Sequence, residues 1–132
     1  MIQNRSKILI KDNSGIVRGR TIQAGRARTQ SLGGVVKFSI TKAKSNWSSK
    51  TKGQKSRPLQ DVVLISSKKP MLRLDGCGLK FQSNHGVTVG RSGKKMALGF
   101  KRINGVVPFE LKKSTHHGAS LGMILKLARN QV

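Results

Sequence analysis

Basic side chains are concentrated in residues 42–57. Six of these sixteen residues are Lys or Arg, where the chain average predicts about three, and none is acidic. The remainder is mainly Ser, Thr, Asn, Gln and Gly. Long cationic donors suit phosphate oxygens, while hydroxyl and amide groups suit phosphate and ribose oxygens. With so few carboxylates in the chain to neutralise it, the segment favours phosphate contact over a solvated loop. The six are Lys42, Lys44, Lys50, Lys52, Lys55 and Arg57.

Trp47 lies within the same segment and allows two interpretations. Its indole could stack on a nucleic-acid base, or it could turn back and pack on the folded part of the chain. The chain holds four Phe, one Trp and no Tyr. Single-strand binders present several aromatic platforms, so this composition favours recognition of backbone and shape over recognition of unstacked bases.

Further basic residues form small clusters outside this segment. Any one of them could be a solvated side chain, so their number carries the inference. One cluster surrounds Ser92-Gly93, where an exposed backbone can approach a phosphate closely. We predict phosphate contacts for Arg18, Arg20, Arg26, Arg28, Lys68, Lys69, Arg73, Arg91, Lys94 and Lys95.

The charge of the whole chain indicates the same class of ligand. Its 132 residues include 27 Lys or Arg and 4 Asp or Glu, a formal net charge of +23. Such a body attracts polyanions. A membrane-surface protein concentrates its charge on one amphipathic helix, whereas basic residues run along this whole chain, so nucleic acid is favoured over a membrane. No apolar run approaches the ~20 residues of a transmembrane helix.

Catalysis and metal binding find little support in the residues. Each of the four carboxylates falls in a predicted turn or at the start of a strand or helix, where it has a conformational explanation. His116 and His117 are adjacent rather than four apart, so they do not predict a shared metal. Cys77, the single cysteine, excludes an internal disulfide and is expected to be a small buried apolar residue. We expect no enzyme, no cofactor and no metal.

Short strands are predicted to carry these side chains through the first two thirds. Val36, Phe38 and Ile40 alternate with polar residues, as in a half-buried strand. Residues 62–65 are continuously apolar, which favours a strand covered on both faces. Asp75-Gly76 lies between two such runs and predicts a hairpin turn with positive φ at both residues. Short strands with Gly-rich turns and no helix between them indicate a small closed barrel.

The last third changes to a helical period. Pro108 can open a short helix, and Ser120 is a plausible N-cap for a second one. An apolar stripe for that helix is formed by Leu121, Ile124, Leu125 and Ala128. We expect one domain over residues 1–132. Its mainly β barrel, with basic loops and a β-hairpin extension, covers 1–105, and a small helical part covers 106–132.

These residues resemble the family of large-subunit ribosomal protein L-fourteen. Met1-Ile2-Gln3 and Asp12-Asn13-Ser14-Gly15 are similar to the opening of that family, and the stretch 32–40 is similar to its segment entering the third strand. Its most specific element is an apolar triplet followed at fixed spacings by a turn ending in Gly, an aromatic, an Asn or Thr, and a Val. Here that element reads Val62-Val63-Leu64, Asp75-Gly76, Phe81, Asn84 and Val87. Thr88 departs from the family pattern, which places an aliphatic residue there.

The resemblance implies a five-stranded barrel of the OB or SH3-like kind and a structural role in the large ribosomal subunit. It implies binding to large-subunit rRNA at the face that meets the small subunit, with small-subunit rRNA at an intersubunit bridge. Neighbouring large-subunit proteins and a ribosome-silencing assembly factor are further implied partners. We assign the contacts with these partners to Lys101, Arg102, Ile103, Lys112 and Lys113.

The high charge, with no leader ahead of the first strand, looks like an organelle-encoded member of the family. We therefore expect a mitochondrial ribosome, with the bacterial cytoplasm and the plastid as alternatives. The alternative function is a free-standing basic RNA- or DNA-binding barrel, such as an RNA chaperone or a nucleoid protein.

Overall fold

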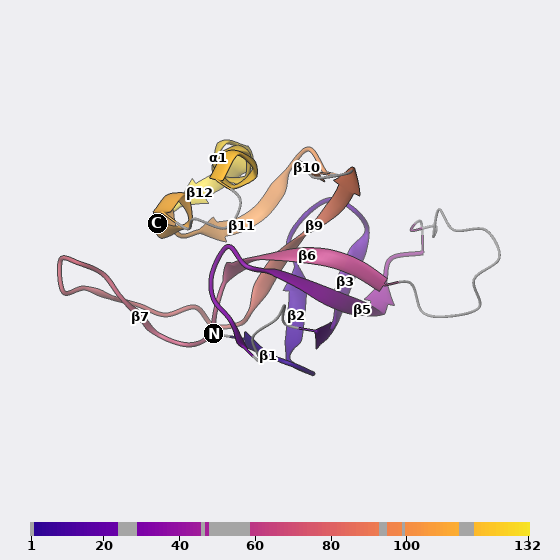
Figure 1. Ribbon diagram of the computed structural model, residues 1–132, viewed down its shortest axis with the longest axis horizontal. Helices are drawn as coiled ribbons and strands as arrows, with labels where there is room; N and C mark the ends of the chain where they lie inside the picture. The colour runs from indigo at the N-terminus through magenta and orange to yellow at the C-terminus, as the bar shows by residue number, and fades with distance from the viewer. Residues whose placement is uncertain are drawn as a thin grey trace.

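A computed structural model describes residues 2–23, 29–45, 47, 59–92, 95–98, 100–113 and 118–132. Five strands close into a barrel: β2 (Lys7–Ile10), β3 (Ile16–Gln23), β5 (Val35–Ala43), β6 (Leu59–Ser66) and β9 (His85–Ser92). They pair in the order β9-β2-β3-β5-β6, and β6 returns to β9, which closes the ring (Figure 1). The pairs are antiparallel except for β2 with β9, which is parallel. The mainly β barrel expected for this sequence is confirmed.

Shorter strands decorate the barrel. The strand β10 (Lys95–Leu98) pairs antiparallel with β9 and is not part of the closed ring. The strand β1 (Ile2–Gln3) pairs with β4 (Thr29–Gln30). A hairpin of β7 (Met71–Leu72) and β8 (Gly78–Leu79) projects away from the barrel (Figure 1).

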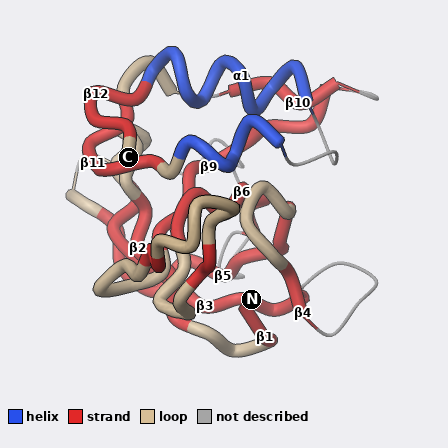
Figure 2. Tube along the Cα trace, turned by 90° about the vertical axis from the view of Figure 1, so that its left-hand side faces the viewer, coloured by secondary structure: helices blue, strands red, loops and turns tan. Residues whose placement is uncertain are grey.

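Two apolar clusters hold the fold together. One fills the barrel interior and includes Ile8, Phe38 and Val62. The other lies between the outer side of the barrel and the C-terminal part, and includes Val63, Ile103 and Leu121. Figure 2 shows the C-terminal helices side by side on one side of the strands.

The strand β6 explains why its sequence is continuously apolar. Val62 and Leu64 belong to the interior cluster, while Val63 and Ile65 belong to the outer one. Successive side chains of a strand point to opposite faces, so a strand covered on both faces needs an apolar residue at every position. The prediction for 62–65 is therefore confirmed. The alternation in β5 is confirmed as well, because Val36, Phe38 and Ile40 are buried while the polar residues between them are not.

The C-terminal part combines helices with a strand pair. Its elements are β11 (Ile103–Val107), the 3-10 helix η1 (Phe109–Lys113), α1 (Gly118–Leu127) and β12 (Ala128–Gln131). The predicted apolar stripe of α1 is buried at Leu121, Ile124 and Leu125. Ser120 lies inside the helix, so the predicted N-cap is wrong. The parallel pairing of β11 with β12 was not predicted, because β12 is short and mostly exposed and has no strand periodicity.

The projecting hairpin turns differently from the prediction. Of Asp75 and Gly76, only Gly76 has a positive φ, at 83°. The amide of Gly76 donates to the carbonyl of Arg73 (3.1 Å), and the amide of Arg73 donates to that of Cys77 (2.9 Å). This is the three-residue loop in which a turn ends on a left-handed glycine, and it needs only one positive φ. Cys77 is exposed, so its predicted burial is wrong.

Asp12 joins the turn after β2 to the neighbouring strand β9. Its Oδ1 accepts from the amide of Ser14 (2.8 Å), while its Oδ2 accepts from both the amide and the hydroxyl of Thr88, at 2.7 Å each. Asp12 and Thr88 are both buried. Thr88 departs from the aliphatic residue of the family pattern, and its hydroxyl has a structural use here.

We expect Thr88→Val to lower the free energy of unfolding by about 1.5 to 3 kcal/mol, because a buried hydrogen bond to a carboxylate is lost. Urea unfolding measures the change. Thr41→Val on the exposed side of β5 is the matched control, and it should stay within about 0.5 kcal/mol of wild type. Equal stability of the two variants would contradict the role assigned to Asp12.

Candidate nucleic-acid interface

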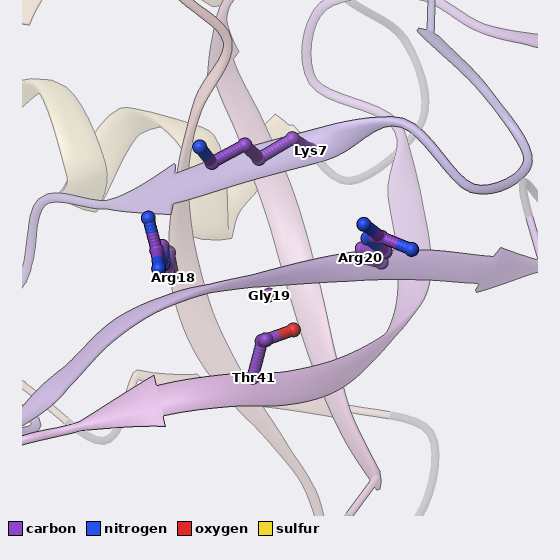
Figure 3. A pocket seen from close by; sticks show the side chains of 5 residues that line it. All are labelled: Lys7, Arg18, Gly19, Arg20 and Thr41. Carbon is purple, nitrogen blue, oxygen red and sulfur yellow. The ribbon is translucent and has the colours of Figure 1, made fainter.

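Three basic side chains meet on the outer face of the barrel. In β2 the side chain of Ile8 points into the barrel, so that of its neighbour Lys7 points outward. In β3 Gly19 is buried, and Arg18 and Arg20 lie on either side of it. The register pairs Lys7 with Arg20, which brings the two strands' cations together. Figure 3 shows Lys7, Arg18 and Arg20 around Gly19, with Thr41 of β5 beside them.

These residues line a shallow hollow of about 140 Å³ with Thr41. We call it the strand-face hollow, defined by Lys7, Arg18, Gly19, Arg20 and Thr41. Among the residues that the structure describes, none of those lining the hollow carries a carboxylate group. Three cations and a hydroxyl around a small open depression provide donors for the oxygens of a phosphate group.

The carboxylates of the chain are engaged elsewhere. Asp12 is held inside by Thr88, Asp75 accepts from the amide of Cys77 (3.2 Å), and Glu110 forms an ion pair with Arg73. Asp61 lies on β6, opposite Lys37 of β5. The positive charge of the strand-face hollow therefore remains available to an external anion.

Lys7 also lines a second, larger hollow of about 380 Å³. Its other lining residues come from β2, from the residue just before β2 and from the segments on either side of the projecting hairpin. We call it the side hollow, and it is lined by Ser6, Lys7, Leu9, Lys68, Gln82, Ser83 and Asn84. The amide of Lys69, the exposed neighbour of Lys68, donates to the hydroxyl of Ser67 (3.2 Å).

The basic segment 42–57 is described only at its start. Lys42 and Lys44 are exposed, and the amide of Lys44 donates to the carbonyl of Gly15 (2.8 Å). Trp47 is half-buried and packs against the interior cluster. Gly15 has a φ of 90°, and a Cβ there would lie 3.2 Å from that of Trp47. The structure thus favours the second interpretation of Trp47, in which it anchors the segment to the barrel.

Several predicted contact residues lie outside the described residues, namely Arg26, Arg28, Lys50, Lys52, Lys55, Arg57 and Lys94. For four others the structure gives the backbone alone, in β9, β10 and η1. These are Arg91, Lys95, Lys112 and Lys113.

Arg73 and Ile103 differ from what their predicted roles require. Arg73 is paired with Glu110, with Nη2 3.4 Å from Oε2, so its charge is largely neutralised and the hairpin is tied to η1. Ile103 is completely buried in the outer cluster, so its side chain cannot reach a partner protein. Its neighbours Lys101 and Arg102 are exposed.

Sequence reasoning missed Lys7. It assigned contacts to clusters of basic residues, and Lys7 stands in a short strand beside apolar neighbours. The signal was available, because alternation around Ile8 and Ile10 places Lys7 on the outward face. The partner strand that completes the group could not be known without the register.

His85 is held between two hydroxyls beside the side hollow. Its Nδ1 lies 2.7 Å from the Oγ of Ser66, and its Nε2 lies 2.8 Å from the Oγ of Ser83. Burial lowers the pKa of His85 below its usual 6.5, and the positive charge of Lys11 lowers it further. The imidazole is therefore neutral at physiological pH.

This lowered pKa predicts acid sensitivity. Between pH 6.5 and the lower folded-state pKa, the unfolded chain binds a proton that the folded chain does not, so the free energy of unfolding falls as the pH falls through this window. Above pH 6.5 His85 is neutral in both states, so it causes no loss of stability there. Denaturant midpoints from pH 7.5 to 5 measure it, and His85→Gln should flatten the dependence. An unchanged profile in that variant would contradict the assignment.

The described residues hold no group of three or more His, Cys, Asp or Glu side chains placed to bind a metal ion. Within the same residues, no helix has the length and apolarity that crossing a membrane requires.

A closed β-barrel with a basic outer face is typical of proteins that bind the sugar–phosphate backbone of nucleic acids. A model of the family described as ribosomal protein L14p/L23e matches residues 1–129. The chain therefore belongs to this family of ribosomal proteins, and its general role is that of a structural protein of the large ribosomal subunit.

Proposed function

We propose that this protein binds large-subunit rRNA through the strand-face hollow and the adjoining basic segments. The observation that carries the proposal is the grouping of Lys7, Arg18 and Arg20 around one hollow with no carboxylate in its described lining. Outward cations on neighbouring strands form a fixed array, whereas a lysine in a loop must lose conformational freedom when it binds. The barrel thus holds these positive charges at fixed positions, where the phosphates of the RNA can bind them.

The predicted loop contacts extend this surface. Lys42 follows Thr41 directly on β5 and pairs in register with Arg18 on β3. The segment 42–57 therefore leaves the barrel beside the strand-face hollow, and its further cations would continue the same phosphate contacts. The free protein, binding isolated rRNA in this way, should lose affinity steeply as salt is added.

Three finer parts of the proposal rest on the family. The protein would lie where the two subunits meet, against small-subunit rRNA and neighbouring large-subunit proteins. Exposed Lys101 and Arg102 would face such partners and a ribosome-silencing factor, together with Lys112 and Lys113. The ribosome would be mitochondrial, consistent with the high charge of the chain.

Sedimentation of a lysate through sucrose gradients tests this function. Blotting at low and then high salt should find the protein with the large subunit in both cases. A signal at the top of the gradient even at low salt would overturn the proposal. The free-standing basic barrel that binds RNA or DNA would then be the better description.

A further inference from the structure

The side hollow brings together two cations, an apolar surface and several polar groups. Lys7 comes from β2 and Lys68 from the loop before the hairpin, while Leu9 contributes a half-buried apolar side chain. Gln82 and Ser83 add an amide and a hydroxyl. Its volume of about 380 Å³ lies within the roughly 300 to 1,000 Å³ of sites that hold small organic groups.

Asn84 connects the backbone segments that carry the two lysines. Its Oδ1 accepts from the amide of Lys68 (2.9 Å), and its Nδ2 donates to the carbonyl of Lys7 (3.3 Å). Its own carbonyl accepts from the amide of Leu9 (3.0 Å). One residue therefore ties the backbones of both lysine-bearing segments together, so their spacing is set before any ligand arrives.

Ser83 is held in place and still has hydrogen-bonding capacity. Its hydroxyl lies 2.8 Å from Nε2 of His85, which Ser66 holds from the other side. A hydroxyl carries one donor and two acceptor lone pairs, so one contact leaves others open whichever tautomer His85 adopts. Gln82 is exposed, and its amide offers both a donor and an acceptor at the rim.

We infer that the side hollow binds one ribose–phosphate unit of RNA and recognises the 2′-hydroxyl. The phosphate lies between Lys7 and Lys68, the sugar ring covers Leu9, and the 2′-hydroxyl contacts Gln82 and Ser83. A group that both donates and accepts matches a hydroxyl, which is the feature that separates RNA from DNA. The scarcity of aromatic side chains in the chain fits a site for sugar and phosphate rather than for a stacked base.

This inference rests on the proposed function but can fail separately from it. Lys7 lies between the two hollows, so one RNA strand can cross from the strand-face hollow to the side hollow. The first hollow offers cations and a single hydroxyl, and it should bind RNA and DNA alike. Discrimination between the two then depends on the second hollow.

The test compares oligouridylate with oligodeoxyuridylate of equal length, which differ only in the 2′-hydroxyl. Fluorescence anisotropy at low salt should show about fivefold to tenfold tighter binding of the RNA by the wild-type protein. The double variant Gln82→Ala with Ser83→Ala should bind both probes as the wild type binds the DNA. Gln23→Ala, an exposed glutamine at the end of β3, is the matched control and should keep the preference.

The outcomes separate the two hypotheses. Equal binding of both probes by the wild-type protein, or a preference that survives in the double variant, would overturn the ribose site and leave RNA binding intact. Absence of salt-sensitive binding to either probe would overturn the proposed function and the ribose site with it. If Ser83→Ala disturbs folding through His85, Gln82→Ala alone decides, since its side chain is exposed.

Discussion

Replacing Lys7, Arg18 and Arg20 together with alanine is expected to weaken RNA binding by about two orders of magnitude at roughly 0.1 M salt. Each neutralised phosphate adds about 0.7 to 0.9 to the slope of log affinity against log salt concentration. Losing three contacts should make this slope shallower by about 2 to 3. Filter binding to large-subunit rRNA at several salt concentrations measures both quantities.

The control for this triple variant removes the same charge elsewhere. Lys80, Lys126 and Arg129 are exposed on the hairpin, on α1 and on β12. Their joint replacement by alanine lowers the net charge by the same three units, and it should change the slope by less than about 1. Equal losses in the two triple variants would mean that total charge, and not the strand face, determines affinity. Circular dichroism should show both variants folded.

The barrel could be predicted from the sequence because the residue types along its strands show which positions are buried. Val36, Phe38 and Ile40 alternate with polar neighbours, and 62–65 lack any polar position because both faces are covered. Such patterns are local and need no knowledge of partners. The pairing of β11 with β12 depends on backbone hydrogen bonds between distant segments, for example from the amide of Val132 to the carbonyl of Val107, and leaves little trace in residue type.

The candidate interface was predictable in class but not in geometry. Charge and composition indicate a phosphate ligand, and Arg18 and Arg20 are among the contacts predicted from them. They do not reveal that Lys7 completes the group, since that depends on the register of β2 with β3. Nor do they reveal that Arg73 is paired with Glu110, thirty-seven residues further along the chain. In both cases the side chains are brought together by contacts between elements that are distant in the sequence, which residue types alone do not show.

Gly19 determines whether this interface can form at all. A Cβ at Gly19 would lie 2.1 Å from the carbonyl oxygen of Ser39 and 2.4 Å from Cζ of Phe38. The absence of a side chain lets β3 approach β5 closely and lets the Phe38 ring occupy the barrel beneath it. Arg18 and Arg20 lie on either side of Gly19 on β3, so we expect their positions to depend on where this approach holds the strand.

We therefore expect Gly19→Ala to lower the free energy of unfolding by about 3 kcal/mol or more, because a Cβ cannot be accommodated without moving backbone. Chemical denaturation measures the loss. Gly122→Ala in α1 is the opposite control. A Cβ there meets nothing within 4 Å, so removing a helical glycine should stabilise the protein by about 0.5 to 1 kcal/mol.

A second substitution separates the two clashes at Gly19. Shortening Phe38 to Leu removes the ring atoms that the new Cβ would meet, but the carbonyl oxygen of Ser39 remains 2.1 Å away. Phe38→Leu should therefore fail to rescue Gly19→Ala, because the closest obstacle is backbone and only a shift of β3 against β5 relieves it. Full rescue would show that the ring alone requires glycine. In that case the close approach of the strands would not be what positions Arg18 and Arg20.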